Sequence, residues 1–283
     1  MITIENLTKN YSDFSLNISL NIPDGTVSGL VGRNGAGKST TIKSILGLIK
    51  PDSGKVQVFG KNVDELTSED KQQLGVALSD SGFSSYLKIK DIKNILKNLY
   101  PSFEEDRFIS LCRQLSLPLD KQIKEFSTGM KAKLRVIVAI THKARLLIMD
   151  EPTSGLDVEA RNELLDILRN YLVENEDCSI LISSHISSDL EGLCDDIYLI
   201  HDGKILLHED TDNLLARYGI LKVSEEMFNT IDKSHVLSWR KEAFGYSLFT
   251  NEKQYYIENY PGIIVENGNI DDLILVMAGG VRQ

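Results

Sequence analysis

The chain has few of the features that mark disulfide-rich, zinc-binding or membrane-spanning proteins. Its 283 residues include 3 cysteines, an odd number with no C-x-x-C pair, which excludes a disulfide scaffold and a zinc ribbon. We expect Cys112, Cys178 and Cys194 to be reduced and buried, as in a cytosolic protein. The longest apolar run, Leu273 to Ala278, is far shorter than the about 20 residues of a membrane-spanning helix. A role at a membrane would therefore require a partner.

Basic residues are also too few for binding along a polyanion. The chain has 31 Lys and Arg against 41 Asp and Glu, a net charge of −10. This balance argues against nucleic-acid binding and against diffuse docking on anionic lipid, both of which need a basic face. A nucleotide site is compatible with it, because the positive field of such a site is local. The start, Met1 to Asn6, lacks the basic and apolar segments of a signal peptide, so we expect no secretion signal.

A glycine-rich segment from Gly32 to Thr40 fits the phosphate-loop pattern G-x-x-x-x-G-K-[ST]. The pattern is informative only between a strand and a helix. Val27 to Val31 predicts a buried strand before it, and the apolar spacing from Ser39 to Ile49 predicts a helix after it. Backbone N–H groups and the helix N-terminus would hold phosphates there. The residues predicted to bind nucleotide are Gly32, Arg33, Asn34, Gly35, Ala36, Gly37, Lys38, Ser39 and Thr40, with Lys38 on the β- and γ-phosphates and Ser39 on Mg²⁺.

Two acidic residues follow an apolar segment that predicts a strand. Leu146 to Met149 run into Asp150 and Glu151, which suggests a buried strand with two acids at its carboxyl edge. Ligands bind at that edge of open α/β sheets. Asp150 is predicted to complete Mg²⁺ binding and Glu151 to orient or deprotonate the attacking water. Two acids that merely solvate a strand end are the alternative.

Three further candidates are ambiguous when taken singly. Tyr11 lies in a turn and could stack on a base, or be an ordinary turn aromatic. Ser127 and Gly129 begin a predicted helix and could bind an anion, although a plain helix cap explains them equally well. His185 follows a strand and could contact a γ-phosphate or the water, or be structural.

The order of predicted elements indicates an α/β fold. Ile2 to Leu7 and Phe14 to Ile22 read as antiparallel strands, and residues 84–143 read as mostly helical. Ile197 to Leu207 reads as a hairpin with an Asp-Gly turn. Strands that alternate with helices up to residue 217 predict a largely parallel sheet.

The remaining residues, 218–283, change in character. Ser247 to Phe249 and Tyr255 to Ile257 suggest short strands, and Ile270 to Met277 suggests a closing helix. This pattern predicts a small α+β extension. It could be a structural or dimer-stabilising appendage, or a regulatory or partner-docking unit.

Residues 1–217 resemble the ATP-binding cassette (ABC) ATPases, the nucleotide-binding subunits of ABC transporters. Gly32 to Thr40 matches their Walker A loop and Leu146 to Glu151 their Walker B strand with its catalytic glutamate. Phe126 to Lys131 looks like a variant of the signature Leu-Ser-Gly-Gly-Gln, and Ser154 to Asp157 looks like the D-loop. The resemblance also identifies His185 with the switch histidine, which with Glu151 and Lys38 forms the catalytic set, and Tyr11 with the adenine-stacking aromatic. The implied fold is a P-loop NTPase cassette with a mixed or parallel sheet core, an N-terminal antiparallel β subdomain and a helical subdomain at about 84–143.

The chain departs from the family where a Q-loop glutamine is usual. Ser79 or Asp80 stands there, and Asp80 is predicted to reach the metal with Ser39 and Asp150. The signature keeps Ser127 and Gly129, the two positions with a phosphate role, and replaces its neighbours with Thr128 and Met130.

The resemblance implies ATP and Mg²⁺ as cofactors and a dimer closed around two ATP molecules. Ser127 and Gly129 would come from the opposite chain, which is a second copy or a related chain. The tail and signature look like subunits paired with multi-spanning ABC-2-type permeases, which implies peripheral attachment at the cytoplasmic face and export of peptides, antibiotics or other amphipathic substrates. A soluble, non-transport ABC ATPase and a weakly hydrolysing regulatory subunit are the alternatives.

Overall fold

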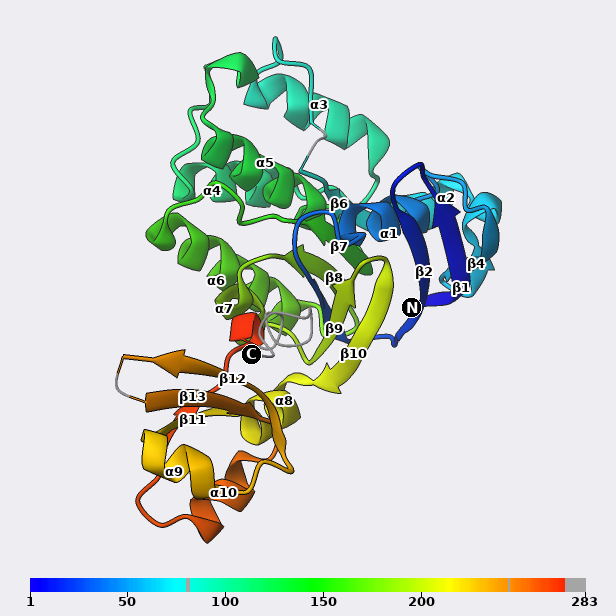
Figure 1. The fold of residues 1–283 in the computed structure, drawn as a ribbon. Helices are drawn as coiled ribbons and strands as arrows, with labels where there is room; N and C mark the ends of the chain where they lie inside the picture. The colour runs from blue at the N-terminus through cyan, green and yellow to red at the C-terminus, as the bar shows by residue number, and fades with distance from the viewer. Residues whose placement is uncertain (80–81, 244, 273–283) are drawn as a thin grey trace.

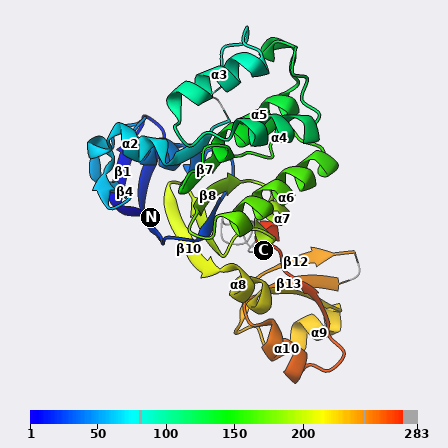
Figure 2. The ribbon, with the colours of Figure 1, turned by 180° about the vertical axis from the view of Figure 1, so that it is seen from behind.

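The computed structural model describes residues 1–79, 82–243 and 245–272. A six-stranded sheet lies at the centre, with an antiparallel sheet on one side of it and a group of helices beyond one end (Figure 1). A second antiparallel sheet, formed by the C-terminal part of the chain, lies at the opposite end from those helices, as the reverse view also shows (Figure 2). The predicted α/β class is confirmed.

The central sheet has the order β10-β9-β3-β8-β7-β6, with parallel pairing except between β9 and β10. Four of its parallel strands therefore present loops that carry predicted site residues at one edge. The strands are β3 (Val27–Val31), β6 (Leu74–Ala77), β7 (Leu146–Asp150), β8 (Ser179–Ser184), β9 (Asp196–His201) and β10 (Lys204–Asp210).

Successive residues of the central strands face two different cores. Leu146 and Ile148 pack in a core shared with the antiparallel sheet, whereas Leu147 and Met149 pack against the helical side. This alternation follows from the two-residue period of a strand. Because both faces are covered, the strands are apolar throughout, as is usual for parallel sheets.

The N-terminal antiparallel sheet has the order β2-β1-β4-β5. Every second residue of β2 is buried, so this sheet packs with one face on the central sheet. Its elements, with the short helices that follow, are β1 (Ile2–Asn10), β2 (Ser15–Ile22), β4 (Ser53–Val58), β5 (Lys61–Asn62), η1 (Val63–Glu65) and α2 (Ser68–Gln72).

The predicted helical region is confirmed, and helix α1 is shorter than predicted. It ends at Ile45 instead of Ile49, because Gly47 adopts a left-handed φ of +68° that stops the helix. The other helices of residues 1–217 are α1 (Lys38–Ile45), α3 (Ile89–Leu99), α4 (Glu105–Gln114), η2 (Ile123–Glu125), α5 (Thr128–Ile140), α6 (Val158–Glu174), α7 (Ser187–Glu191) and α8 (Thr211–Arg217). No helix in the described ranges is long and apolar enough to cross a bilayer.

The C-terminal part forms a β-α-β-β-α-β unit with the antiparallel order β12-β13-β11-β14. This is the split βαβ arrangement of ferredoxin-like folds. Its elements are β11 (Gly219–Val223), α9 (Glu225–Thr230), β12 (Val236–Glu242), β13 (Gly245–Thr250), α10 (Lys253–Asn259) and β14 (Ile264–Asn267).

One predicted strand in this unit is wrong. Tyr255 to Ile257 lie in helix α10, where Tyr256 is fully buried and stacks on Tyr260 one turn later. Three apolar residues are too few to separate a strand from a helix by period, and aromatic content then favours the wrong choice. The strand predicted at Ser247 to Phe249 is confirmed within β13. The helix predicted from Ile270 to Met277 lies largely outside the described residues.

The three cysteines are free and buried, as predicted. Burial raises the pKa of the Cys112 and Cys178 thiols to about 12, so neither forms a reactive thiolate near neutral pH.

Ile270 attaches the end of the C-terminal unit to the main core. Its side chain is fully buried in the same apolar cluster as Leu190 and Leu214, and its backbone N–H donates to Glu191 Oε1 at 3.1 Å. The contact joins the C-terminal unit to helix α7.

We predict that Ile270→Ala lowers the free energy of unfolding by about 2–5 kcal/mol, because it leaves a cavity in this shared core. Ile257→Ala, in the same unit but 46% exposed, is the matched control with a small expected effect. Denaturant titration of both variants measures the difference. Equal stability of the two variants would contradict the docking of Ile270.

Candidate active site

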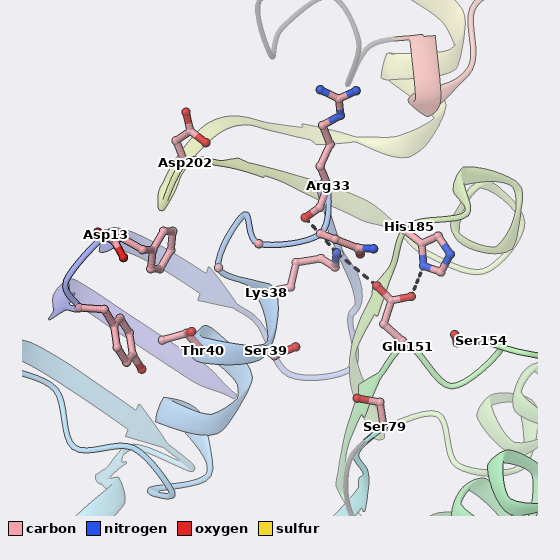
Figure 3. A pocket seen from close by; sticks show the side chains of 15 residues that line it. Asp13, Arg33, Lys38, Ser39, Thr40, Ser79, Glu151, Ser154, His185 and Asp202 are labelled. Carbon is pink, nitrogen blue, oxygen red and sulfur yellow. Dashed lines mark hydrogen bonds and ion pairs between the residues drawn. The ribbon is translucent and has the colours of Figure 1, made fainter. Parts of the chain in front are cut away.

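A cavity of about 810 Å³ opens at the carboxyl edge of the central sheet (Figure 3). The loops that follow β1, β3, β6, β7, β8 and β9 surround it. Ligand sites in open α/β sheets occur at this edge. The lining residues are Tyr11, Asp13, Phe14, Arg33, Asn34, Gly35, Gly37, Lys38, Ser39, Thr40, Ser79, Glu151, Ser154, His185 and Asp202.

The glycine-rich loop needs glycine for two separate reasons. Gly35 and Gly37 have φ values of +83° and +117°, which side-chain-bearing residues rarely adopt. At Gly32 the reason is close packing, since a Cβ atom there would lie 2.2 Å from the carbonyl oxygen of Ile200. The loop thus leads into helix α1, whose first residues Lys38, Ser39 and Thr40 line the cavity. The unpaired N–H groups of a helix N-terminus stabilise an anion.

Lys38 connects the loop to the acidic strand end. Its side chain is 6% exposed, and its Nζ donates to the Gly32 carbonyl at 2.7 Å and lies 3.2 Å from Glu151 Oε1. Figure 3 shows Lys38 and Glu151 pointing toward each other across the cavity. A largely buried ammonium is stable only with such partners.

Asp150 lies behind the cavity wall and is 2% exposed. Its Oδ2 accepts from the hydroxyls of Ser39 at 2.9 Å and Ser79 at 3.4 Å, and its Oδ1 accepts from Ser183 at 2.6 Å. The carboxylate and two hydroxyls at the cavity form a cluster of hard oxygen donors, the type that Mg²⁺ prefers. Ser79 was one of two sequence alternatives at this position. The other, Asp80, lies outside the described residues.

Glu151 is held in an unusual backbone conformation, with φ at +52°. Its N–H donates to the carbonyl and the hydroxyl of Ser183, at 3.1 and 3.0 Å. Its Oε2 contacts Nδ1 of His185, which is 44% exposed. The two residues thus meet at the mouth of the cavity, with Glu151 between His185 and Lys38. Non-glycine residues in the left-handed region cluster at functional sites.

Aromatic and acidic side chains form another side of the cavity. Tyr11 is 46% exposed and its ring lies 6.2 Å from that of Phe14. Asp13 and Asp202 also line this side and were not predicted. The Asp-Gly turn signal located the hairpin that carries Asp202, but sequence alone could not show that this turn packs on the phosphate loop, where Gly203 N–H donates to the Ala36 carbonyl at 3.0 Å.

The sequence-predicted residues do not all meet in one cavity. Ser127 and Gly129, both within the described ranges, are not among its lining residues. Ser127 caps helix α5 by accepting from Met130 N–H, and a Cβ atom at Gly129 would lie 3.0 Å from a methyl carbon of Leu156. Gly32 and Ala36 support the loop from behind rather than line the cavity.

Comparison with known proteins gives one consistent result. A family model described as "ABC transporter" matches residues 16–154. A lantibiotic transport ATP-binding protein of Streptococcus pyogenes is 35% identical over 216 residues, which cover 75% of this chain and 92% of the relative. A bacitracin transport ATP-binding protein of Bacillus licheniformis is 35% identical over 221 residues, covering 77% of this chain and 72% of the relative. A linearmycin resistance ATP-binding protein of Bacillus subtilis is 29% identical over 269 residues, 91% and 85% of the two chains.

Solved structures agree with the fold. An ATP-binding subunit of an ABC transporter superimposes with a TM-score of 0.68 and 27% identity, covering 76% of this chain and 92% of that one. A dimeric ABC transporter cassette gives a TM-score of 0.65 at 20% identity, covering 75% and 99%. This second likeness supports the fold alone.

We predict that Tyr11→Ala weakens ATP binding roughly 10-fold, since stacking of a base on an aromatic ring contributes about 1–3 kcal/mol. Tyr11→Phe keeps the ring and should retain most of the affinity. Tyr86→Ala, at a tyrosine that is 70% exposed and outside the cavity, is the control. The measurement is titration with a fluorescent ATP analogue, and unchanged affinity of Tyr11→Ala would exclude a stacking role.

Proposed function

The chain belongs to the ATP-binding proteins of ABC transporters, and we propose that ATP hydrolysis in its 810 Å³ cavity powers export through a separate membrane permease. The observation that carries this proposal is the pairing of two loops. Lys38 forms an ion pair with Glu151, and the Ser39 hydroxyl donates a hydrogen bond to Asp150. The phosphate loop and the acidic end of β7 therefore lie beside the same cavity.

In this proposal the phosphate loop and helix α1 hold the triphosphate. The backbone N–H groups around Gly35 and Gly37 and the Lys38 ammonium bind the phosphate oxygens, and Tyr11 stacks on the adenine. The positive charge of the helix N-terminus supports the same site. The overall charge of −10 does not prevent this, because these donors act over a few ångströms.

Mg²⁺ fits the oxygen donors at the sheet edge. Ser39 and Asp150 would hold it, and the Ser79 hydroxyl, which donates to Asp150 Oδ2, lies beside them. The proposed role of Asp80 at the metal stays a prediction, because this residue lies outside the described ranges. When bound, the ion neutralises charge on the phosphates during transfer to water.

Glu151 is the proposed general base, and His185 steadies the γ-phosphate. A triphosphate oxygen is a competing partner for Lys38, which would leave the Glu151 carboxylate to accept a proton from the attacking water. Ser183 fixes the backbone of Glu151 by two hydrogen bonds, so its carboxylate stays near the cavity mouth.

Two cassettes are proposed to close around the nucleotides. Ser127 is exposed, and neither Ser127 nor Gly129 lines this chain's own cavity. Both stand at the start of helix α5, where they could contact the ATP of an opposite chain. The opposite chain is a second copy or a related ATPase. Residues 1–217 would act as the cassette and 218–283 as an accessory domain.

The proposed partner is a multi-spanning ABC-2-type permease, which would hold the chain at the cytoplasmic face of the membrane. Residues 84–110 are the proposed docking region. Two large apolar side chains stand exposed there, Tyr86 at 70% and Leu99 at 56%. The relatives named for lantibiotic transport, bacitracin transport and linearmycin resistance support a peptide, antibiotic or other amphipathic cargo.

We predict that Glu151→Gln lowers the rate of ATP hydrolysis at least about 100-fold while ATP binding is retained, because the amide cannot accept the proton of water. The variant should form a stable dimer in ATP and Mg²⁺, seen by size-exclusion chromatography. Glu69→Gln, at an exposed residue of helix α2, should hydrolyse ATP at the wild-type rate. Wild-type turnover in Glu151→Gln would remove this residue from the mechanism.

We further predict that the tagged chain co-purifies from membranes with a multi-spanning protein. Tyr86→Ala with Leu99→Ala should reduce the recovered partner roughly tenfold, since buried aromatic contacts dominate such interfaces. ATP hydrolysis by the isolated double variant should be unchanged. Val173→Ala, at a side chain that is 77% exposed on helix α6, is the control. Full recovery with the double variant would place the docking surface elsewhere.

A further inference from the structure

Asp189 is a buried carboxylate behind the active site that the proposed chemistry does not use. It lies on helix α7, four residues after His185, and its side chain is 2% exposed. A carboxylate in such a place is stable only when donors and positive charge surround it. The residues that contact Asp189 therefore show which segments it holds together.

Both partners come from elements that begin near Glu151. Thr153, two residues after Glu151 and 1% exposed, donates its hydroxyl to Asp189 Oδ2 at 2.6 Å. The Arg161 guanidinium, on helix α6, lies 3.6 Å from Asp189 Oδ1. Asp189 thus joins three segments: the loop after β7, the start of helix α6 and the helix that follows His185.

These contacts bracket the Glu151–His185 pair. On the strand side, Glu151 N–H is held by Ser183, two residues before His185. On the far side, Thr153 is held by Asp189, four residues after His185. The Glu151 loop and the His185 segment are therefore tied together both before and after the place where their side chains meet.

We infer that Asp189 is a positioning residue that keeps His185 against Glu151. The inference rests on the proposed function, because it assigns a role in hydrolysis. Asp189 does not touch the cavity, so it acts through the geometry of the pair and not on the nucleotide. Loss of its charge should therefore lower kcat and leave nucleotide affinity unchanged.

The test uses the full chain and three substitutions. Asp189→Asn keeps the shape and removes the charge that Arg161 faces. Thr153→Val keeps the shape and removes the hydroxyl, whereas Thr153→Ser keeps the hydroxyl. We expect Asp189→Asn and Thr153→Val to lower kcat about 10-fold or more with unchanged KM for ATP, and Thr153→Ser to stay near wild type. The matched control is Asp166→Asn, since Asp166 is exposed and pairs with Arg169 on helix α6.

A coupling measurement separates positioning from a general structural effect. In a His185→Ala background, Asp189→Asn should cause little further loss of single-turnover rate, because the residue that it positions is gone. An equal fold-loss in both backgrounds would overturn the inference. So would wild-type kcat in both Asp189→Asn and Thr153→Val.

A measurement without hydrolysis keeps this test distinct from that of the proposed function. The imidazole NMR signal of His185, assigned by its loss in His185→Ala, should move in Asp189→Asn and Thr153→Val and stay in Asp166→Asn. An unmoved signal would overturn the positioning role even if the wild type hydrolyses ATP. A moved signal in a protein that does not hydrolyse ATP would support the positioning and reject the proposed function.

Discussion

The placement of Lys38 beside Glu151 at the carboxyl edge of the central sheet is the constraint on which the site depends. It brings together two loops that are more than a hundred residues apart in the chain, at 3.2 Å between charged atoms. The parallel sheet makes this possible, because β3 and β7 flank β8 and all three end at the same edge. A strand order that did not place β3 and β7 on the two sides of β8 would separate the phosphate loop from the carboxylates.

The two apolar cores fix the register of the central strands, and so the positions of the residues at their carboxyl ends. Alternate residues of each central strand anchor in different cores, so a one-residue slip of β7 would exchange its two faces. It would also carry Asp150 away from the hydroxyls of Ser39 and Ser183. Packing far from the cavity thereby sets distances of a few ångströms within it.

Much of this arrangement could be predicted from sequence because its signals are local. Gly37 and Lys38 belong to a sequence pattern that predicts a phosphate loop, and the apolar residues before Asp150 predict the end of a buried strand. The failures have physical causes. Tyr255 to Ile257 are too short a run to carry a period, and the contacts of Asp202 and Asp189 depend on which loops meet in space. Contacts between residues that are distant in the chain produce no pattern of fixed spacing in the sequence, so they could not be predicted from it.

The central claim is that Lys38 and the acidic strand end share one magnesium-bound triphosphate. Calorimetric titration of ATP in Mg²⁺ into the wild type and Lys38→Ala tests it most directly. The account predicts binding by the wild type and at least roughly 10-fold weaker binding by Lys38→Ala, with Lys55→Ala, at an exposed lysine outside the cavity, unchanged. A wild-type protein that does not bind ATP, or equal affinity in Lys38→Ala, would contradict it.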